Sequence, residues 1–276
     1  SPSSGIYHNT EGRGMGWERA CSAEYFFAGE NPSERGFQMD CGVRIQGFTS
    51  RAPSRNPKHS LRLAFREKYG KTKLKHPLFG NEGPREFDTI VLRSNSQDAW
   101  VYDSSGNRAG QFIRDHWNRR IMEMLGQPAP KSNWVHLYLN GLYWGVYNPT
   151  ERPDTSFSQS RHGGNEENFD SIKNHEEVLA GSIASYRNLL GLIQKDSGNF
   201  NKGYRDLSNP FEYREVLPFI EVVNLADYMI HNMYSAARDW PGNFYIGYDR
   251  SGDHGGWWFY DWDNEHGLKG SVNENR

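Results

Sequence analysis

Hydrophobic and polar residues alternate along much of the first half of the chain. In residues 41–47 (CGVRIQG), valine and isoleucine alternate with arginine and glutamine. In residues 58–67 (KHSLRLAFRE), leucine and phenylalanine again occupy every second position. A period of two places one set of side chains on each face of a strand. The pattern predicts strands at 41–47 and 58–67, and the apolar segment 87–94 (FDTIVLRS) predicts another.

Turn signals predict two β-hairpins. Asn140 and Gly141 separate two apolar segments within residues 134–148 (WVHLYLNGLYWGVYN), and Asn-Gly is the strongest short hairpin signal. A second hairpin is expected where NFYIGYD (243–249) is followed by GWWFYDW (256–262).

A third possible hairpin concerns the two cysteines of the chain. If residues 17–27 and 36–47 pair, with a turn near residue 31, Cys21 and Cys41 lie symmetrically about that turn. They would then be cross-strand neighbours. A disulfide and a pair of small buried thiols both fit this arrangement.

Helical spacing appears in three segments. Residues 111–125 (QFIRDHWNRRIMEML) precede Gly126, a helix stop, and 182–196 and 217–237 are the other two predicted helices. The apolar stripe expected on the first is Ile113, Trp117, Ile121 and Met124. That expected on the last is Phe219, Val222, Ala226, Met229 and Met233. A β-rich part followed by a helical part predicts an α+β, two-lobed domain.

The amino-acid composition indicates which classes of binding partner the chain is unsuited to. The chain has 276 residues, of which 36% are hydrophobic and 14% aromatic, so aromatic side chains must supply much of the buried area. The net charge of −2 lacks the basic excess of a nucleic-acid binder, and no apolar run could span a membrane. We therefore expect neither nucleic acid nor membrane as a partner. The chain opens abruptly without a signal peptide, and we expect it to be part of a larger multidomain protein.

Acidic residues cluster around the last predicted hairpin. Asp239 and Asn243 precede it, while Asp263 and Glu265 follow it. Mg²⁺ binds a few carboxylate or amide oxygens together with substrate phosphates. Asp239 could orient a hydroxyl nucleophile beside a metal-binding Asn243, as in the kinase catalytic loop. The same residue types also form ordinary turns, so spacing alone leaves a solvated rim as the alternative.

Basic residues follow the first predicted strand. Gly42 and Gly47 would allow close backbone approach to phosphate, and arginines grip phosphate oxygens in a fork. The basic residues of this segment are Arg44, Arg51, Arg55 and Lys58. The segment matches neither the P-loop nor GxGxxG, and an exposed basic loop is the alternative.

Glu151, which follows the Asn-Gly hairpin, is a candidate ion-pair partner for Lys58. Asp115 and Glu123 on the first predicted helix are rivals, although Arg119 could pair with both at i,i+4 spacing. The histidines show no zinc-binding spacing, and no GxSxG nucleophile elbow is present.

Several of these stretches together resemble the CotH family of spore-coat-protein-H-like atypical protein kinases. The matching stretches run in family order from about residue 40 to 268: GVRIQGFTSR, PKHSLRLAF, YGKTKLKHPLFG, FDTIVLRSN, FIRDHW, VHLYLNGLYWGVYNPTERPD, ARDWPGNFY and FYDWDNEHGL.

The resemblance implies a divergent protein-kinase-like fold that binds ATP with Mg²⁺ or Mn²⁺. It implies phosphorylation of Ser/Thr hydroxyls on proteins, including the chain itself, and an extracellular or cell-surface setting. One domain would span residues 1–276: a preceding strand region (1–40), a β-rich lobe (about 41–150) and a helical lobe (about 151–276).

The resemblance also assigns roles to individual residues. Lys58 corresponds to the nucleotide-phosphate lysine, with Arg44 and Arg51 in the basic loop ahead of it. Glu151 falls at the family's ER position. The site residues after residue 200 are the catalytic Asp239 and the metal-binding Asn243, Asp263 and Glu265.

Two departures from the family pattern matter. The segment DWPGN separates Asp239 from Asn243 by four residues, where relatives usually have five, which could move Asn243 away from a metal. The ending DNEHG has Glu265 where the family has a second aspartate, and His266 where it has an aromatic residue. Glutamate keeps the carboxylate.

Three alternatives remain open from the sequence. AMP transfer, rather than phosphoryl transfer, is a variant of the kinase hypothesis. The shortened DWPGN also fits an inactive pseudokinase that serves as an interaction module of an extracellular or coat assembly. A carbohydrate-active or carbohydrate-binding module would use paired carboxylates and stacking tryptophans, namely Trp240, Trp257, Trp258 and Trp262.

Overall fold

The structure is a computed structural model that describes residues 4–27, 36–80, 83–101, 110–174, 176–195 and 203–268. The chain divides into two compact units. Unit 1 comprises residues 1–114 and 131–152, and unit 2 comprises residues 115–130 and 153–276. Both contain antiparallel sheet, and the described ranges contain no helix long and apolar enough to cross a bilayer.

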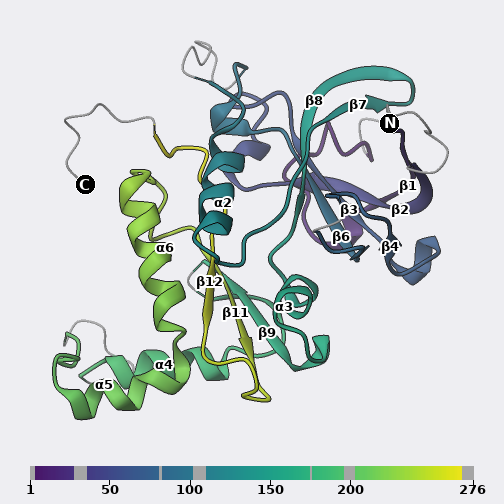
Figure 1. The fold of residues 1–276 in the computed structure, drawn as a ribbon. Helices are drawn as coiled ribbons and strands as arrows, with labels where there is room; N and C mark the ends of the chain where they lie inside the picture. Colours follow the sequence, from purple (N-terminus) through teal and green to yellow (C-terminus); the bar gives the residue numbers. More distant parts are fainter. Residues whose placement is uncertain are drawn as a thin grey trace. The chain divides into compact units, whose positions relative to one another are not determined.

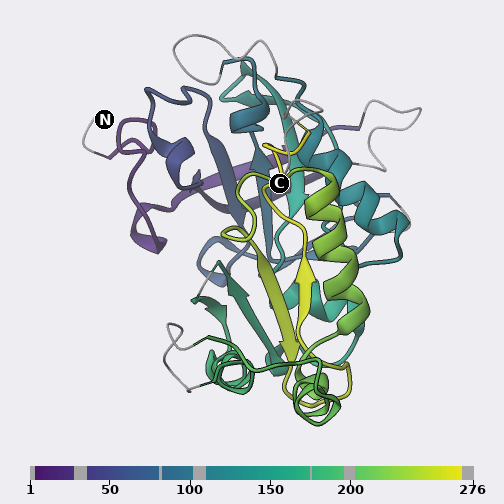
Figure 2. The same ribbon diagram turned by 90° about the vertical axis from the view of Figure 1, so that its left-hand side faces the viewer.

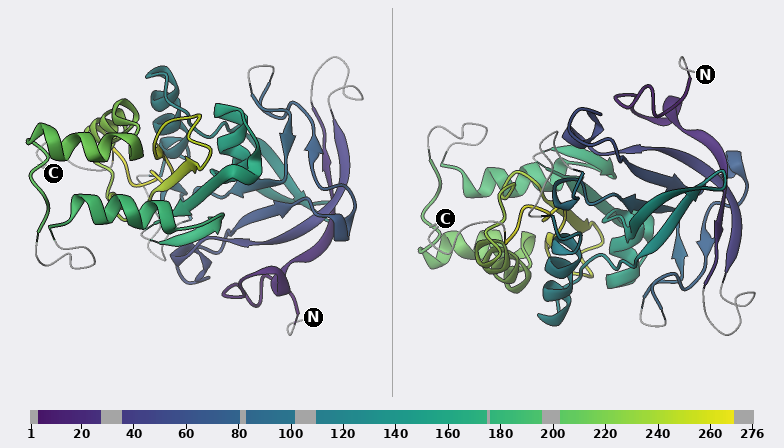
Figure 3. Two further views of the ribbon diagram at one scale, coloured as in Figure 1. Left: turned by 90° about the horizontal axis from the view of Figure 1, so that it is seen from below. Right: turned by 90° about the horizontal axis from the view of Figure 1, so that it is seen from above.

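Unit 1 is built on a six-stranded antiparallel sheet with strand order β1-β2-β3-β6-β8-β7 (Figure 1). The strands are β1 (Arg19–Tyr25), β2 (Phe37–Gln46), β3 (Ser60–Ala64), β6 (Thr89–Arg93), β7 (Val135–Leu139) and β8 (Leu142–Glu151). The sheet curls along its length (Figure 3). A two-stranded ribbon, β4 (Leu74–Lys75) with β5 (Glu86–Phe87), and short 3₁₀ turns complete the unit.

The predicted hairpins of unit 1 are confirmed. β1 pairs with β2 in a register that places Cys21 directly opposite Cys41. β7 pairs with β8, and Asn140 and Gly141 take the positive φ angles, 49° and 81°, that the tight turn between them requires.

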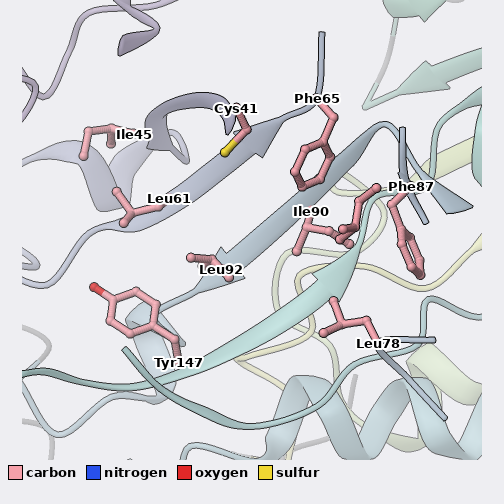
Figure 4. Close-up of a cluster of buried hydrophobic side chains, with 10 residues drawn as sticks. Cys41, Ile45, Leu61, Phe65, Leu78, Phe87, Ile90, Leu92 and Tyr147 are labelled. Atoms are coloured by element: carbon pink, nitrogen blue, oxygen red, sulfur yellow. The ribbon is translucent and has the colours of Figure 1, made fainter. Parts of the chain in front are cut away.

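The two faces of this sheet differ in chemistry. One face carries the apolar residues of the alternating pattern and packs into the core of unit 1, where Leu61, Ile90 and Tyr147 are almost fully buried (Figure 4). The other face carries the polar set, in which Arg44 lies directly opposite Arg62. This polar face is not a solvated one, because Arg62 is only 8% exposed.

Unit 2 contains a four-stranded antiparallel sheet with strand order β10-β9-β11-β12. Its strands are β9 (Phe169–Lys173), β10 (Glu177–Ala180), β11 (Tyr245–Asp249) and β12 (Trp258–Tyr260). The pairing of β11 with β12 confirms the last predicted hairpin. β9 and β10 were not predicted, so this part of the chain is less purely helical than the sequence indicates.

The α-helices within the described ranges belong to unit 2, apart from the first residue of α2 (Figures 1 and 2). α2 begins at Arg114, the last residue of unit 1, and the others lie wholly in unit 2. They are α2 (Arg114–Met124), α3 (Thr155–His162), α4 (Ala184–Ile193), α5 (Pro210–Val216) and α6 (Val222–Tyr234). α6 runs beside β12 in both views.

The apolar stripes predicted for α2 and α6 are wrong. Met124 is 77% exposed and Met233 is 53% exposed, while both helices bury polar residues instead. The buried residues include Asp115, Asn118 and Arg119 on α2, and Asn224, His231 and Asn232 on α6. Three of them, Asn224 on α6 and Asp115 and Asn118 on α2, hydrogen-bond to the backbone of other segments of unit 2.

Asn224 of α6 shows how such a partner acts. β12 is an edge strand, and Phe259 at its centre donates its N–H to Asn224 Oδ1 over 2.6 Å. Asn224 Nδ2 donates in return to the carbonyl oxygen of Phe259 over 3.2 Å. The amide side chain thus takes the place of a neighbouring strand at this residue.

Candidate active site in unit 2

Two loops of unit 2 bring an amide and a carboxylate together. Residues 239–243 lead from α6 into β11, and residues 261–267 follow β12. Asn243 Nδ2 donates to Asp263 Oδ2 over 3.1 Å, and Asn243 N donates to the carbonyl of Asp239 over 2.9 Å. The shortened DWPGN segment therefore closes a tight turn and still leaves Asn243 against Asp263.

Asp239, on the first of these loops, interacts electrostatically with Asp263 and His266 on the second. Burial raises the pKa of its carboxyl, the charge of His266 opposes the shift, and the carboxylate of Asp263 adds to it. Asp239, Asn243, Asp263 and His266 are each partly exposed. A carboxylate that reaches solvent and holds a proton more readily than usual suits proton acceptance from a hydroxyl group.

Polar residues of α2 fix the loop that carries Asp263. The next residue, Asn264, donates its backbone N–H to Asp115 Oδ1 over 2.9 Å and accepts from Asn118 Nδ2 at its carbonyl over 3.2 Å. Asp115 is held in turn by a buried ion pair with Arg119 at 3.0 Å. Asp263 itself has a φ of 65°, a left-handed conformation that surrounding structure must hold in place.

The oxygen atoms that these two loops offer would fill only part of the coordination shell of a divalent cation. Asn243 and Asp263 offer two oxygen-bearing side chains in contact, and Mg²⁺ completes such a set with substrate phosphates and water. Glu265, the third predicted ligand, is buried at 3% exposure. Among the described residues, no three His, Cys, Asp or Glu side chains gather closely enough to hold a metal ion.

Lys58, predicted to bind nucleotide phosphate, lies in unit 1 just before β3. Its ammonium group donates to the carbonyl of Val146, and lies 4.5 Å from the ring centroid of Tyr147 and 4.9 Å from that of Phe112. Burial lowers the pKa of Lys58 to about 8. Lys58 makes no ion pair within the parts of the chain that the structure describes.

The predicted partner of Lys58 is engaged elsewhere in unit 1. Glu151 is 3% exposed, and its Oε2 accepts from the backbone N–H of Lys131 over 2.7 Å. The proposed ion pair between Lys58 and Glu151 is therefore not formed. The rival acids have partners on their own helix, since Asp115 pairs with Arg119 and Glu123 pairs with Arg120.

Arg44 and Arg51 are both engaged with protein groups. Arg51 is 6% exposed, and its guanidinium donates to four backbone carbonyls, those of Thr10, Gly12, Ile45 and Gly47. Arg44 lies 3.9 Å from Glu18. In this conformation Arg51 holds its loop against the first residues of the chain, and Arg44 faces a carboxylate.

Glu18 is the centre of a basic cluster that the sequence did not reveal. Its side chain is fully buried, and Arg66 at 3.2 Å and Lys68 at 3.4 Å join Arg44 around it. A Cβ at Gly42 would come within 2.6 Å of the Glu18 side chain. Gly42 thus makes room for Glu18, where the sequence suggested room for phosphate. We define Glu18, Arg44, Arg66 and Lys68 as the Glu18 cluster.

The sequence of the chain matches the model of a known protein family. The model described as CotH kinase protein matches residues 43–275, which is most of the chain. The chain belongs to the CotH family. All eight site residues predicted above lie within the matched range of the CotH domain, whereas β1 and Glu18 precede it. No curated protein matched the CotH chain.

The polar face of the CotH sheet carries further residues that sequence reasoning missed. Arg93 on β6 is 5% exposed and shares this face with Arg62 and Arg44. The alternating pattern placed Arg44 and Arg62 opposite the apolar positions of their strands, and it assigned no face to Arg93. It could not indicate that the face is buried, because burial depends on segments distant in sequence.

The tryptophans considered for sugar stacking are packing residues of the CotH domain. Trp257 is fully buried and stacks on Tyr248 with ring centroids 5.1 Å apart, and Trp262 is 9% exposed. Trp240 and Trp258 are partly buried. Packing of this kind leaves little of the Trp257 and Trp262 rings for a ligand.

Proposed function

We propose that this CotH domain is a divalent-metal- and ATP-dependent atypical protein kinase with a kinase-like two-lobed fold. It would transfer the γ-phosphoryl group of ATP to Ser/Thr hydroxyls of proteins, including its own. Family membership supports the class of reaction. The observation that carries the proposal is the contact between Asn243 and Asp263, with Asp239 in electrostatic interaction with Asp263.

In this proposal each residue of unit 2 has one task. Asn243 and Asp263 would hold Mg²⁺ or Mn²⁺, which when bound neutralises charge on the phosphates. Asp239 would accept the proton of the attacking hydroxyl, a task that its raised pKa favours. The grip of Asp115 and Asn118 on Asn264 would keep Asp263 in its left-handed conformation.

In unit 1 we assign phosphate binding to Lys58 and Arg44. When a nucleotide binds, the guanidinium of Arg44 would leave the carboxylate of Glu18 and bind phosphate oxygens instead. Arg51 would act through its loop, because its donors bind backbone carbonyls. Glu151 would support the segment at Lys131, and Glu265 would contribute to the metal site from a buried position.

The family also supports a coat or surface setting for this activity. A nucleotide-binding pseudokinase is the second candidate function. It is favoured by one observation, the absence of a three-residue His/Cys/Asp/Glu metal group among the described residues.

The test is transfer of label from ATP to protein with Mg²⁺ or Mn²⁺. Wild type would be compared with Lys58→Ala, Asp239→Asn and Asp263→Asn, and the labelled site would be mapped by mass spectrometry. We expect γ-label on wild type and a loss of at least about 100-fold in the aspartate variants, the usual scale for removing general-base or metal contributions. Asp253→Asn, on the exposed β11–β12 turn, should behave as wild type.

The other outcomes separate the alternatives. Label from α-labelled ATP, retained on the protein, would indicate AMP transfer. Stabilisation by ATP without any label would indicate a pseudokinase. If neither binding nor transfer occurs with either metal, the kinase proposal fails.

A further inference from the structure

The cysteines of unit 1 form a close pair between two adjacent strands. Cys21 on β1 and Cys41 on β2 are direct partners in the antiparallel register, and their Sγ atoms lie 3.4 Å apart. Both are thiols in this structure. Directly opposed residues of an antiparallel pair have Cα atoms about 4.5 or 5.5 Å apart, and both values lie within the range that a disulfide spans.

The surroundings of the pair suit a disulfide. Cys41 is fully buried in the core of unit 1, and Cys21 is partly exposed and packs against the same core. A disulfide is apolar and takes less room than two separate thiols, so closing the bond would leave the core intact. Formation of an S–S bond of about 2.0 Å needs only a short approach of the two sulfurs.

We propose that Cys21 and Cys41 are a redox pair that closes to a cross-strand disulfide and fastens edge strand β1 to the sheet. β1 is hydrogen-bonded to the sheet on one side only, through β2. A covalent link at Cys21 therefore acts on an edge strand, which has only one strand partner in the sheet.

The partly exposed thiol of Cys21 reacts first. A hydrogen bond from the Cys41 thiol lowers the pKa of Cys21, and the same contact together with burial raises the pKa of Cys41. The Cys21 thiolate would attack a small-molecule disulfide such as oxidised glutathione, forming a mixed disulfide and releasing one glutathione thiolate. Cys41 then loses its proton to solvent and attacks Sγ of Cys21, which expels the second glutathione. The protein loses two hydrogens, and one oxidised glutathione becomes two reduced molecules.

Closure has a consequence for the Glu18 cluster. Glu18 immediately precedes β1 and lies three residues from Cys21. Its buried carboxylate contacts Arg44 on β2, and it also contacts Arg66 and Lys68, which follow β3. Glu18 therefore connects the start of β1 to these two segments. The disulfide would hold the acid on these basic groups, and reduction would leave it held by β1 pairing and charge alone.

The experiment equilibrates the purified chain with defined ratios of oxidised to reduced glutathione. Intact mass and alkylation of free thiols after quenching measure the redox state. Oxidation should lower the mass by about 2 Da and remove both alkylation sites together. The melting temperature should rise by on the order of 5 °C, because the bond closes a loop of roughly twenty residues. Amide exchange across Arg19–Tyr25 should slow relative to exchange in β7.

Variants and alternative outcomes make the test decisive. Cys21→Ser should show neither the mass loss nor the exchange change, and it keeps the buried Cys41 in the core. Cys41→Ala should behave likewise, with some added loss of stability from its cavity. Two thiols that remain alkylatable in excess oxidised glutathione would overturn the proposal, as would stable glutathione adducts or linkage between chains. None of these readouts uses ATP, so the result is independent of the kinase proposal.

Discussion

At the scale of single residues, Lys58 shows how burial changes the chemistry of a side chain. The sequence indicates a lysine able to reach phosphates, and the structure places its ammonium among ring faces and a backbone carbonyl. The pKa of about 8 follows from this desolvation. Such a lysine is charged below that pH and largely neutral above it, whereas a solvated lysine stays charged to above pH 10.

The pKa of Lys58 predicts a pH dependence for the proposed nucleotide binding. Because only the charged form attracts phosphate, affinity should fall as pH rises through about 8. At pH 9 about one-tenth of Lys58 would be charged, so the dissociation constant of Mg-ATP should increase by up to about tenfold. Calorimetric titrations between pH 7 and pH 9 measure this change.

A pair of variants distinguishes charge from packing at Lys58. Lys58→Arg keeps a charge throughout this range and should flatten the profile, while Lys58→Met should bind weakly at every pH. A wild-type affinity that stays constant from pH 7 to pH 9 would contradict the assigned role.

At the scale of elements, α6 shows that a buried helix face can be polar. The predicted stripe of methionines and aliphatic residues faces outward, and Asn224 faces the sheet because β12 needs a partner for Phe259. α2 follows the same rule where it grips Asn264. At Asn224, Asp115 and Asn118 the buried position is occupied by a side chain that hydrogen-bonds the backbone of another segment.

Removing the Asn224 side chain should therefore be costly. Asn224→Ala leaves both the N–H and the carbonyl of Phe259 without this partner, and we expect a loss of about 2–4 kcal/mol in the free energy of unfolding. Ile230→Ser, on the exposed face of the same helix, should change it by less than about 0.5 kcal/mol. Urea denaturation of both variants measures the difference, and the opposite order would contradict this account of α6.

At the scale of the whole molecule, the boundary of the family match differs from the boundary of the folded unit. The match begins at residue 43, within β2, yet β1 pairs with β2 over seven residues and unit 1 extends to the start of the chain. Strand β1 therefore covers an edge that the matched region alone would leave open.

A shortened chain tests the contribution of this preceding segment. A chain beginning at residue 36 loses β1, Glu18 and two of the four carbonyls that accept from Arg51, and it exposes the edge of β2. We expect the melting temperature to fall by on the order of 10 °C and self-association to increase. Calorimetry and light scattering measure these effects, and an unchanged melting temperature would show that β1 contributes little.

Local sequence predicted the main strands of unit 1 and three hairpins, although it did not predict β4, β5, β9 or β10. Alternation and an Asn-Gly pair are short-range signals, and the symmetry of Cys21 and Cys41 about a single turn was enough to predict their register. The same locality predicted that Asn243 and Asp263 lie close, because one hairpin joins them. The order of family motifs indicated the CotH family, which the family match bears out.

Tertiary structure alone decided which faces are buried and which charges meet. Glu18 and Lys68 are fifty residues apart, and no local pattern brings them together. The partners of Arg51, the isolation of Lys58 from Glu151 and the polar inner faces of α2 and α6 depend on packing between distant segments. Periodicity reports that a face exists, but burial and hydrogen-bond demand are properties of the assembled chain.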